Sequence, residues 1–336
     1  TAILREMSAS LCEAVTGYDN AQVVLENLVH LNLFTIPLDD ENRWFRYHHL
    51  FADVLQSHLK QQGAARWAAV HQSAAAWYEC AGDIQKAVYH YVEANDHTGA
   101  AGCLDTLTVK DIERVGTLQF LRWIDALPES VLMAFPNLLV SAAYADTAMQ
   151  HDAHTASTAY LPLARAALGR YRGSQDIREH LEARLAVIES RQILSRLGDI
   201  ERCLELMNFA LPRLEHDAAW RGLALLHLAK VHISLDDMES SGPSLVHTIL
   251  LADGRDYLPV LLRAAHDLGL ILLRETKVAA ANHYFQLALR AAERQGEADH
   301  PMMSAVYMGV YYGAAHRADA DQALAYLDRV IQLASR

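Results

Sequence analysis

The sequence predicts a mostly α-helical chain, in which a small winged-helix domain precedes a right-handed superhelix of tetratricopeptide-like helix hairpins. Three observations carry this prediction. A strand–turn–strand pattern lies between two helical patterns, at Leu33–Phe51. Beyond about residue 60, strand signals vanish and helical patterns follow one another. Two nearly identical turns, Gly82–Ala87 and Gly198–Cys203, each end one apolar helix and begin another.

The winged helix is predicted from the order of its elements. Residues Asn20–Asn32 predict an amphipathic helix, one face of which carries Val23, Val24, Leu28 and Leu31. Leu33–Leu38 and the first half of Arg43–Phe51 predict two strands joined by a polar turn. The second strand runs into a helix that opens on paired histidines, His48 and His49. Helix, hairpin and helix together make a winged-helix module.

This winged helix lacks the charge of a DNA-binding domain. DNA-binding modules present Lys and Arg to phosphates, but no Lys or Arg occurs from Glu6 through Asn42. Acidic residues occur there instead, at Glu13, Asp19, Glu26, Asp39, Asp40 and Glu41. The whole chain has a formal net charge of −12, which repels a phosphate backbone. We expect no direct nucleic-acid partner, and we expect the module to contact protein or nucleotide within a larger switch.

Composition also indicates a compartment. The four cysteines form no Cys-x-x-Cys pair, so we expect free thiols in a reducing cytoplasm; they are Cys12, Cys80, Cys103 and Cys203. No apolar run approaches the roughly 18 residues of a membrane span. The chain begins without Met, in what reads as a helical pattern already under way, and Leu327–Arg336 is still helix-like. We therefore expect a piece of a longer protein.

The helices after the winged helix repeat. Small residues recur where the two helices of a hairpin touch, most clearly at Leu268, Gly269, Leu272, Ala281, Phe285 and Ala288. The same positions hold Ala74, Ala75, Tyr78, Ala87, Tyr91 and Ala94 early in the chain, and Val310, Tyr311, Ala314, Ala323, Leu327 and Val330 late. Weaker copies place Ala156, Cys203 and Ser241 at the position that Ala281 and Ala323 occupy in the clearer copies. From Ala156 to Ala323, these five positions are 47, 38, 40 and 42 residues apart. These exceed the roughly 34 of a standard tetratricopeptide, so the helices or turns must be longer.

We expect three parts: residues 1–60 as the winged helix, residues 61–135 as a connecting arm of helical hairpins, and residues 136–336 as repeats. A hairpin cannot bury its own apolar face, so the hairpins must stack. Pro128 ends a helix at the arm's far end and Pro136 opens the next one. The alternative is an irregular helical domain with chance Gly-Asp turns.

Motifs of catalysis are absent from the sequence. It contains no GxxxxGK[ST], no GxSxG and no HExxH. His48 and His49, and likewise His151 and His154, have no nearby Cys or further His at metal-ligand spacing. Acidic pairs such as Asp236–Asp237 suit helix N-termini. We expect neither an enzyme nor a metal site.

The order of parts resembles the MalT-like regulators, which are signal-transduction ATPases of the STAND class that end in a LuxR-type DNA-binding domain. The resembling residues are Leu25–Leu28, Leu31–Phe34, Phe45–Leu55, His71–Asp96 and Trp123–Pro136. The first segments are fairly specific, whereas the repeats alone occur in many unrelated proteins. The resemblance implies a middle fragment: residues 1–60 would close the nucleotide-oligomerisation module, and the repeats would form the sensor.

The resemblance also implies partners and a nucleotide contact. Such regulators bind a small inducer in the array, exchange ADP for ATP on their own nucleotide-binding domain, self-associate and activate transcription. A winged-helix histidine, within a Met-His-Asp-Leu-like motif, meets the β-phosphate of ADP. That residue is His48 here, although Tyr47 and His49 replace the Met and Asp. His49 is the fallback, and the alternative is that His48 only caps or packs its helix. This chain itself would hold no cofactor, since it lacks the P-loop.

A protein-docking scaffold is the competing function, because most tetratricopeptide arrays are scaffolds. Scaffold grooves grip peptide carboxylates with Lys and Arg, whereas a sugar or aromatic inducer favours Tyr, Trp and His. The inner positions of the first helices are mixed: Lys230, Arg263, His266, Met308 and Tyr312. We expect Lys230, Arg263, His266 and Tyr312 to contact the inducer, whose identity the sequence does not name.

Overall fold

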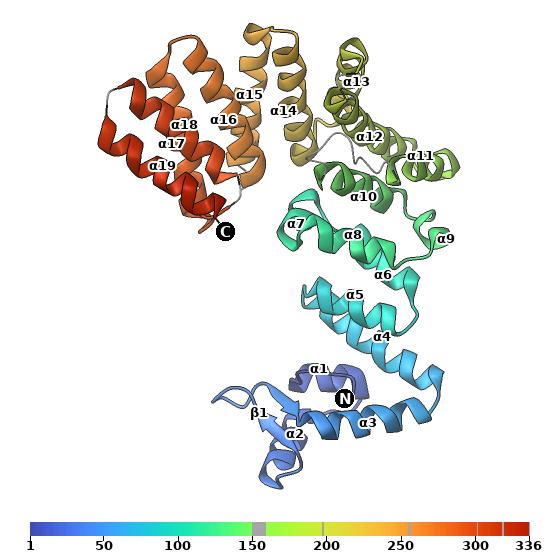
Figure 1. Ribbon diagram of the computed structural model, residues 1–336. Coiled ribbons are helices and arrows are strands. Elements are labelled where there is room, and N and C mark those ends of the chain that lie inside the picture. The colour runs from blue at the N-terminus through green and yellow to red at the C-terminus, as the bar shows by residue number, and fades with distance from the viewer. Residues whose placement is uncertain (150–158, 197, 255–256, 301, 318, 336) are drawn as a thin grey trace. The chain divides into compact units, whose positions relative to one another are not determined.

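The computed structural model describes residues 1–149, 159–196, 198–254, 257–300, 302–317 and 319–335. His151, His154 and Ala156 lie outside these ranges. The chain forms two compact units: residues 1–108 with 118–138, and residues 109–117 with 139–336 (Figure 1). No helix in the described part of the chain combines the length and the apolar character that crossing a membrane needs.

The first unit begins with the winged helix. Its elements are α1 (Ala9–Thr16), α2 (Ala21–His30), β1 (Thr35–Pro37), β2 (Phe45–Tyr47) and α3 (His49–Gln61). The two strands pair antiparallel, with Ile36 opposite Arg46. Phe45, Met7 and Leu11 are fully buried and form the centre of this small core. The strand–turn–strand prediction is therefore confirmed, with shorter strands than the sequence pattern indicates.

Two details of the N-terminal part differ from expectation. The first helix begins only after Ser8, whose side chain accepts a hydrogen bond from the Leu11 amide, so the chain does not open inside a helix. The apolar face predicted for the second helix is largely exposed, with Val23, Val24 and Leu31 each more than half accessible. Instead, α2 packs through Ala21 and Leu25, which are buried.

The rest of the first unit is helical. Its elements are α4 (Ala64–Cys80), α5 (Ile84–Glu93), α6 (His97–Asp105), α8 (Thr117–Asp125) and α9 (Glu129–Leu132). Between α4 and α5, Gly82 adopts a φ of 78° that favours glycine, and Asp83 caps α5 by accepting from the Lys86 amide at 3.1 Å. The contact positions Ala74, Ala75 and Ala87 have no exposed surface. The early hairpin is thus confirmed.

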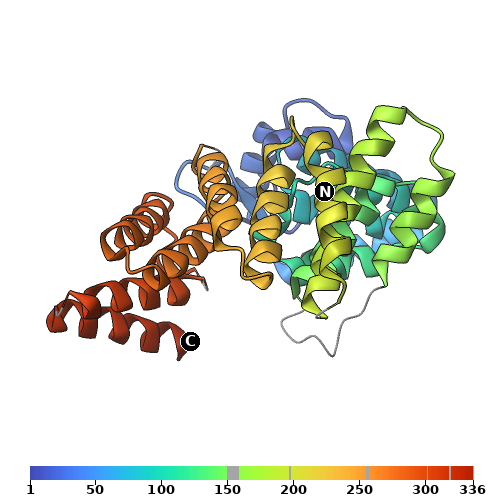
Figure 2. The same ribbon diagram turned by 90° about the horizontal axis from the view of Figure 1, so that it is seen from above.

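The second unit contains α7 (Val109–Val115), α10 (Pro136–Met149) from Leu139 on, and the repeat helices. The repeat helices are α11 (Tyr160–Arg170), α12 (Gln175–Ser195), α13 (Ile200–Arg213), α14 (Ala218–Ser234), α15 (Met238–Asp253), α16 (Leu258–Arg274), α17 (Val278–Arg294), α18 (Met303–His316) and α19 (Ala320–Ala334). Consecutive helices pair as hairpins from α12 to α19, and the first helices α12, α14, α16 and α18 also pack on one another (Figure 2). Helices of 14 to 21 residues account for the long repeat spacing.

The predicted small residues lie at the contacts of these hairpins. Cys203, Ser241 and Ala281 have no exposed surface. A Cβ placed on Gly269 would lie 2.3 Å from the Phe285 ring, so only glycine fits there. In the late hairpin Tyr311 is part-exposed. Gly309 of α18 approaches Phe285 of α17, and a Cβ there would lie 2.3 Å from the ring, so this contact joins neighbouring hairpins. A mostly helical chain, with stacked hairpins after a winged helix, is confirmed.

Candidate functional site

His48 lies at the junction between strand β2 and helix α3. It is the N-cap residue of α3, and its amide donates to the Phe34 carbonyl at 2.7 Å. Its side chain makes no capping hydrogen bond, and its ring lies 4.4 Å from the His49 ring, centroid to centroid. Both histidines keep solvent access, His49 more than His48. The imidazole of His48 therefore does not cap α3 through a hydrogen bond, but it does pack on the His49 ring.

Exposed apolar side chains occur on α2, on the hairpin and on α3 of the winged helix. Phe34 contacts Phe51 at a centroid distance of 5.3 Å, yet 59% of Phe34 is exposed. We call the following residues the winged-helix apolar surface: Val23, Val24, Leu31, Leu33, Phe34, Ile36, Leu38, Leu50 and Val54, all at least 38% exposed. Large exposed apolar surfaces on proteins mark interaction sites.

The predicted inducer contacts lie on adjacent first helices of the second unit. Lys230 comes from α14, and Arg263 and His266 come from α16; all three are part-buried. Burial lowers the pKa of Lys230 to about 8; the charge of Arg263 adds to this effect, and Asp267 opposes it. Lys230 and Arg263 therefore lie close together. Tyr312 on α18 is 45% exposed, and its ring contacts Tyr311.

The sequence prediction missed a buried polar group beside these residues. The carboxylate of Glu113 on α7 accepts from the Tyr144 hydroxyl at 2.6 Å and from the Tyr257 hydroxyl at 3.1 Å. Burial raises the pKa of Glu113, while the two tyrosine donors and Arg191 of α12 oppose that rise. Arg191 also acts on Lys230 electrostatically. Polar residues lie all around α12, so its sequence gave no signal that Arg191 faces inward.

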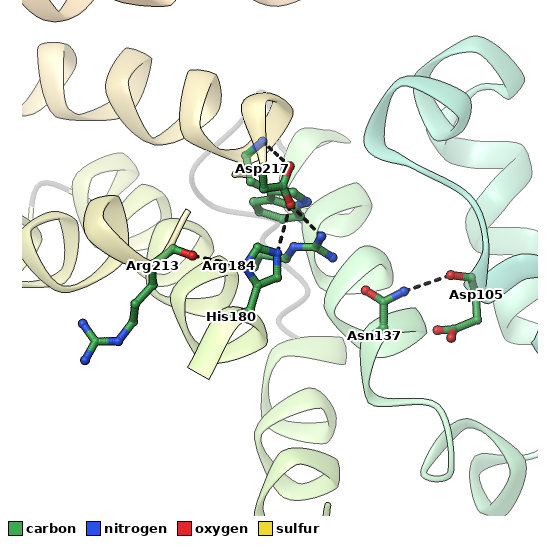
Figure 3. A network of polar contacts seen from close by, with 7 residues as sticks. Asp105, Asn137, His180, Arg184, Arg213 and Asp217 are labelled. Atoms are coloured by element: carbon green, nitrogen blue, oxygen red, sulfur yellow. Dashed lines mark hydrogen bonds and ion pairs between the residues drawn. The ribbon is translucent and has the colours of Figure 1, made fainter. Parts of the chain in front are cut away.

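A second polar group has a structural role (Figure 3). Asp217 caps α14 by accepting from the Trp220 amide at 3.2 Å, and it also accepts from His180 Nε2 at 3.1 Å and Arg184 at 2.6 Å. Burial alone would raise the pKa of Asp217, but these two partners bring it down to about 2. His180 also contacts the Arg213 carbonyl at 3.2 Å. The group thereby joins α12, α13 and α14.

In the first unit, the Asn137 amide donates to the Asp105 carbonyl at 2.9 Å and holds the end of α6 (Figure 3). All four cysteines are free, and Cys80 alone of them is exposed. Among the described residues, no group of three or more His, Cys, Asp or Glu side chains is placed to hold a metal ion.

Comparison with known proteins gives matches over both parts of the chain. Residues 1–67 match the model of the MalT winged helix domain. Serine/threonine-protein kinase PknK of Mycobacterium tuberculosis is 29% identical over 204 residues, which are 60% of this chain and 18% of the kinase. The HTH-type transcriptional regulator MalT of Klebsiella pneumoniae is 30% identical over 146 residues, which are 43% of this chain and 16% of the regulator. The chain thus spans less than a fifth of these relatives.

A solved structure with a similar fold is that of a STAND protein with a tetratricopeptide repeat sensor from Pyrococcus horikoshii. It superposes with a TM-score of 0.66 over 99% of this chain and 49% of its own, at 13% identity. At that identity the superposition shows the fold alone. Together with the winged-helix match, it confirms the resemblance to MalT-like STAND regulators.

Proposed function

We propose, from this likeness, that the chain is the switching and sensing part of a signal-responsive, ATP-dependent transcription activator. The observation that carries the proposal is the MalT-type winged helix at residues 1–67, followed by stacked helix hairpins. The full-length protein would contain a nucleotide-binding domain and a LuxR-type DNA-binding domain, and it would act in the cytoplasm. This chain would not be an enzyme, since the sequence holds no P-loop motif.

The winged helix is the proposed contact with the nucleotide-binding domain. The winged-helix apolar surface leaves nine large apolar side chains exposed, which favours a protein partner, and its acidic surroundings disfavour DNA. His48 lies beside it with an imidazole that makes no capping bond. In the ADP-bound resting state, that imidazole would donate to the β-phosphate. Exchange of ADP for ATP would release the contact and permit self-association.

The repeat array is the proposed inducer site. Lys230, Arg263 and His266 lie part-buried on the first helices, which pack on one another within the second unit. A small molecule bound there would favour one arrangement of the hairpins and shift the switch. Tyr312 lies on α18, the first helix of the following hairpin, and would cover the far side of such a ligand.

The two relatives are of different kinds, since one is a serine/threonine-protein kinase and the other a transcriptional regulator. Transcription activation is the output we propose, because the family match is to the MalT winged helix. A peptide-binding scaffold is the competing function.

Isothermal titration of the chain against a metabolite panel tests the proposal. One small molecule should bind with a stoichiometry near one, and it should also raise reporter transcription by the full-length protein. If no metabolite binds, while unfolded acidic peptides bind to the array, the scaffold is the better description.

A further inference from the structure

Three cationic side chains converge on the first helices α12, α14 and α16. His227 Nε2 lies 2.9 Å from Ser190 Oγ, which fixes α14 against α12. Arg191 directly follows Ser190, and Lys230 lies one turn beyond His227. Gly222 of α14 faces Val260 of α16, at 3.8 Å from where a Cβ would lie. Because first helices run parallel, Lys230 lies near the Arg263–Asp267 turn.

These cations make none of the close ion pairs that other cations in the unit make. Arg184 pairs with Asp217 at 2.6 Å, and Arg294 pairs with Asp253 at 2.6 Å. Within the described part of the second unit, Arg191, Lys230 and Arg263 make no ion pair with a carboxylate; Arg263 donates only to Met302 Sδ, at 3.4 Å. Two carboxylates lie near them. One oxygen of Glu113 receives two tyrosine hydroxyls and one oxygen of Asp267 lies 3.2 Å from His266, while Glu113 Oε2 and Asp267 Oδ2 are buried without a hydrogen-bond partner.

Such a cluster is costly unless something occupies it. Each side chain is part-buried, and each neighbouring cation disfavours the charge of the others, which Asp267 offsets at Lys230 and Glu113 offsets at Arg191. A chain with 41 acidic residues could supply a carboxylate at this place, as it does at Asp217. The three cations outnumber these two carboxylates, and the surplus positive charge points to a ligand that brings negative charge itself.

We propose that Arg191, Lys230 and Arg263 form an anion subsite, so that the array's ligand is a small molecule bearing a carboxylate or a phosphate. This inference rests on the proposed function, in which the array binds a small molecule. Guanidinium groups bind both kinds of oxyanion through paired donors, and an ammonium adds a compact charge. The three cations are part-buried and come from neighbouring helices, which suits a small anion.

The experiment measures the thermal unfolding midpoint of the chain in titrations with phosphate, with citrate and with sodium chloride at equal ionic strength. Phosphate or citrate should raise the midpoint more than chloride, because only a ligand of the folded state adds stability. The anion that raises the midpoint more, phosphate or citrate, identifies the kind of oxyanion that the subsite binds. Lys230→Met and Arg263→Met should weaken that response roughly ten-fold or more, the worth of one charge-assisted hydrogen bond. Lys277→Met, at an exposed lysine paired with Glu275 at 2.9 Å, is the matched control.

The unliganded variants give a second readout. Lys230→Met should unfold at the same temperature as the parent or higher, because it removes an unpaired charge and keeps an apolar stem. A lower midpoint without ligand would show a structural cation and overturn the subsite, as would equal responses to chloride and the oxyanions. If the metabolite panel yields a neutral ligand whose affinity Lys230→Met leaves unchanged, the proposed function stands and this inference fails.

Discussion

At His48, the backbone and the side chain have different hydrogen-bonding roles. Its backbone is tied into the hairpin by the Phe34 carbonyl and into α3 by the carbonyl it offers to Phe51 and Ala52. Its imidazole is left out of the capping pattern. The backbone of this residue therefore stabilises the fold, while its side chain makes no capping hydrogen bond and contacts the His49 ring.

We predict that His48→Ala in the full-length protein raises transcription without inducer. Loss of a charge-assisted hydrogen bond to ADP, worth roughly 1.5–3 kcal/mol, would shift the resting equilibrium about ten-fold or more toward the active state. A reporter assay measures this, with His49→Ala as the matched control. Unchanged basal activity at normal protein levels would favour the packing role, and a response of His49→Ala alone would move the contact to the fallback residue.

A second residue-scale prediction concerns a buried histidine pair in the first unit. His71 Nδ1 and His90 Nδ1 lie 3.0 Å apart and both residues are almost fully buried, with the Tyr78 ring stacked on His90. Burial lowers the pKa of each to about 4. The folded state thus keeps them neutral, while the unfolded chain takes up protons below its ordinary pKa near 6.5.

Stability should therefore be fully present above about pH 6.5 and fall as the pH drops toward 4. Urea unfolding midpoints between pH 7.5 and 5 measure the slope. The double variant His71→Gln/His90→Gln keeps a neutral hydrogen-bonding pair, so its slope should be shallower. His227, whose pKa burial lowers to about 3, retains part of the dependence. The exposed control His30→Gln should match the parent; an unchanged slope in the double variant would contradict the assignment.

Among the elements, the Phe285 ring is the central packing contact of the last two hairpins. It projects from α17 and fills the space that Gly269 of α16 and Gly309 of α18 leave open. Phe285 itself has no exposed surface. A side chain added at either glycine would push the Phe285 ring toward the other glycine. The ring therefore has no free space to move into.

We predict that Gly269→Leu destabilises α16–α19 by about 1–3 kcal/mol, the usual cost of overpacking. Because hairpins lean on their neighbours, hydrogen exchange should quicken in residues 301–335 more than in the winged helix. Gly242→Leu on α15 is the control, since nothing lies within 4 Å of a Cβ there. Equal loss of protection in Leu33–Tyr47 would contradict the stacked array and its repeat alignment.

At the scale of the whole molecule, charge separates this chain from a DNA-binding protein. We predict that the purified chain binds neither DNA nor ATP, because its winged helix is acidic and its sequence has no phosphate-binding loop. Fluorescence anisotropy with duplex DNA over a salt series and equilibrium dialysis with ATP measure this. Tight, salt-dependent DNA binding would show that the acidic winged helix is no barrier to phosphate contact.

The sequence by itself determined the elements and their repeat. Alternating and helical periods placed the hairpin and the helices, Gly82 and Asp83 marked a turn, and the spacing of Cys203, Ser241 and Ala281 fixed the hairpin contacts. These features are local, because a residue's backbone preference and its immediate neighbours decide them.

Only the tertiary structure decided which faces meet. It exposed Val23 and Val24 of an apolar helix face, and it brought Gly309 of α18 against Phe285 of the preceding hairpin. It also brought Arg191 to Lys230, and His71 to His90, from separate helices. A helical period shows that a face exists, but the partner that covers that face, or leaves it bare, comes from elsewhere in the chain.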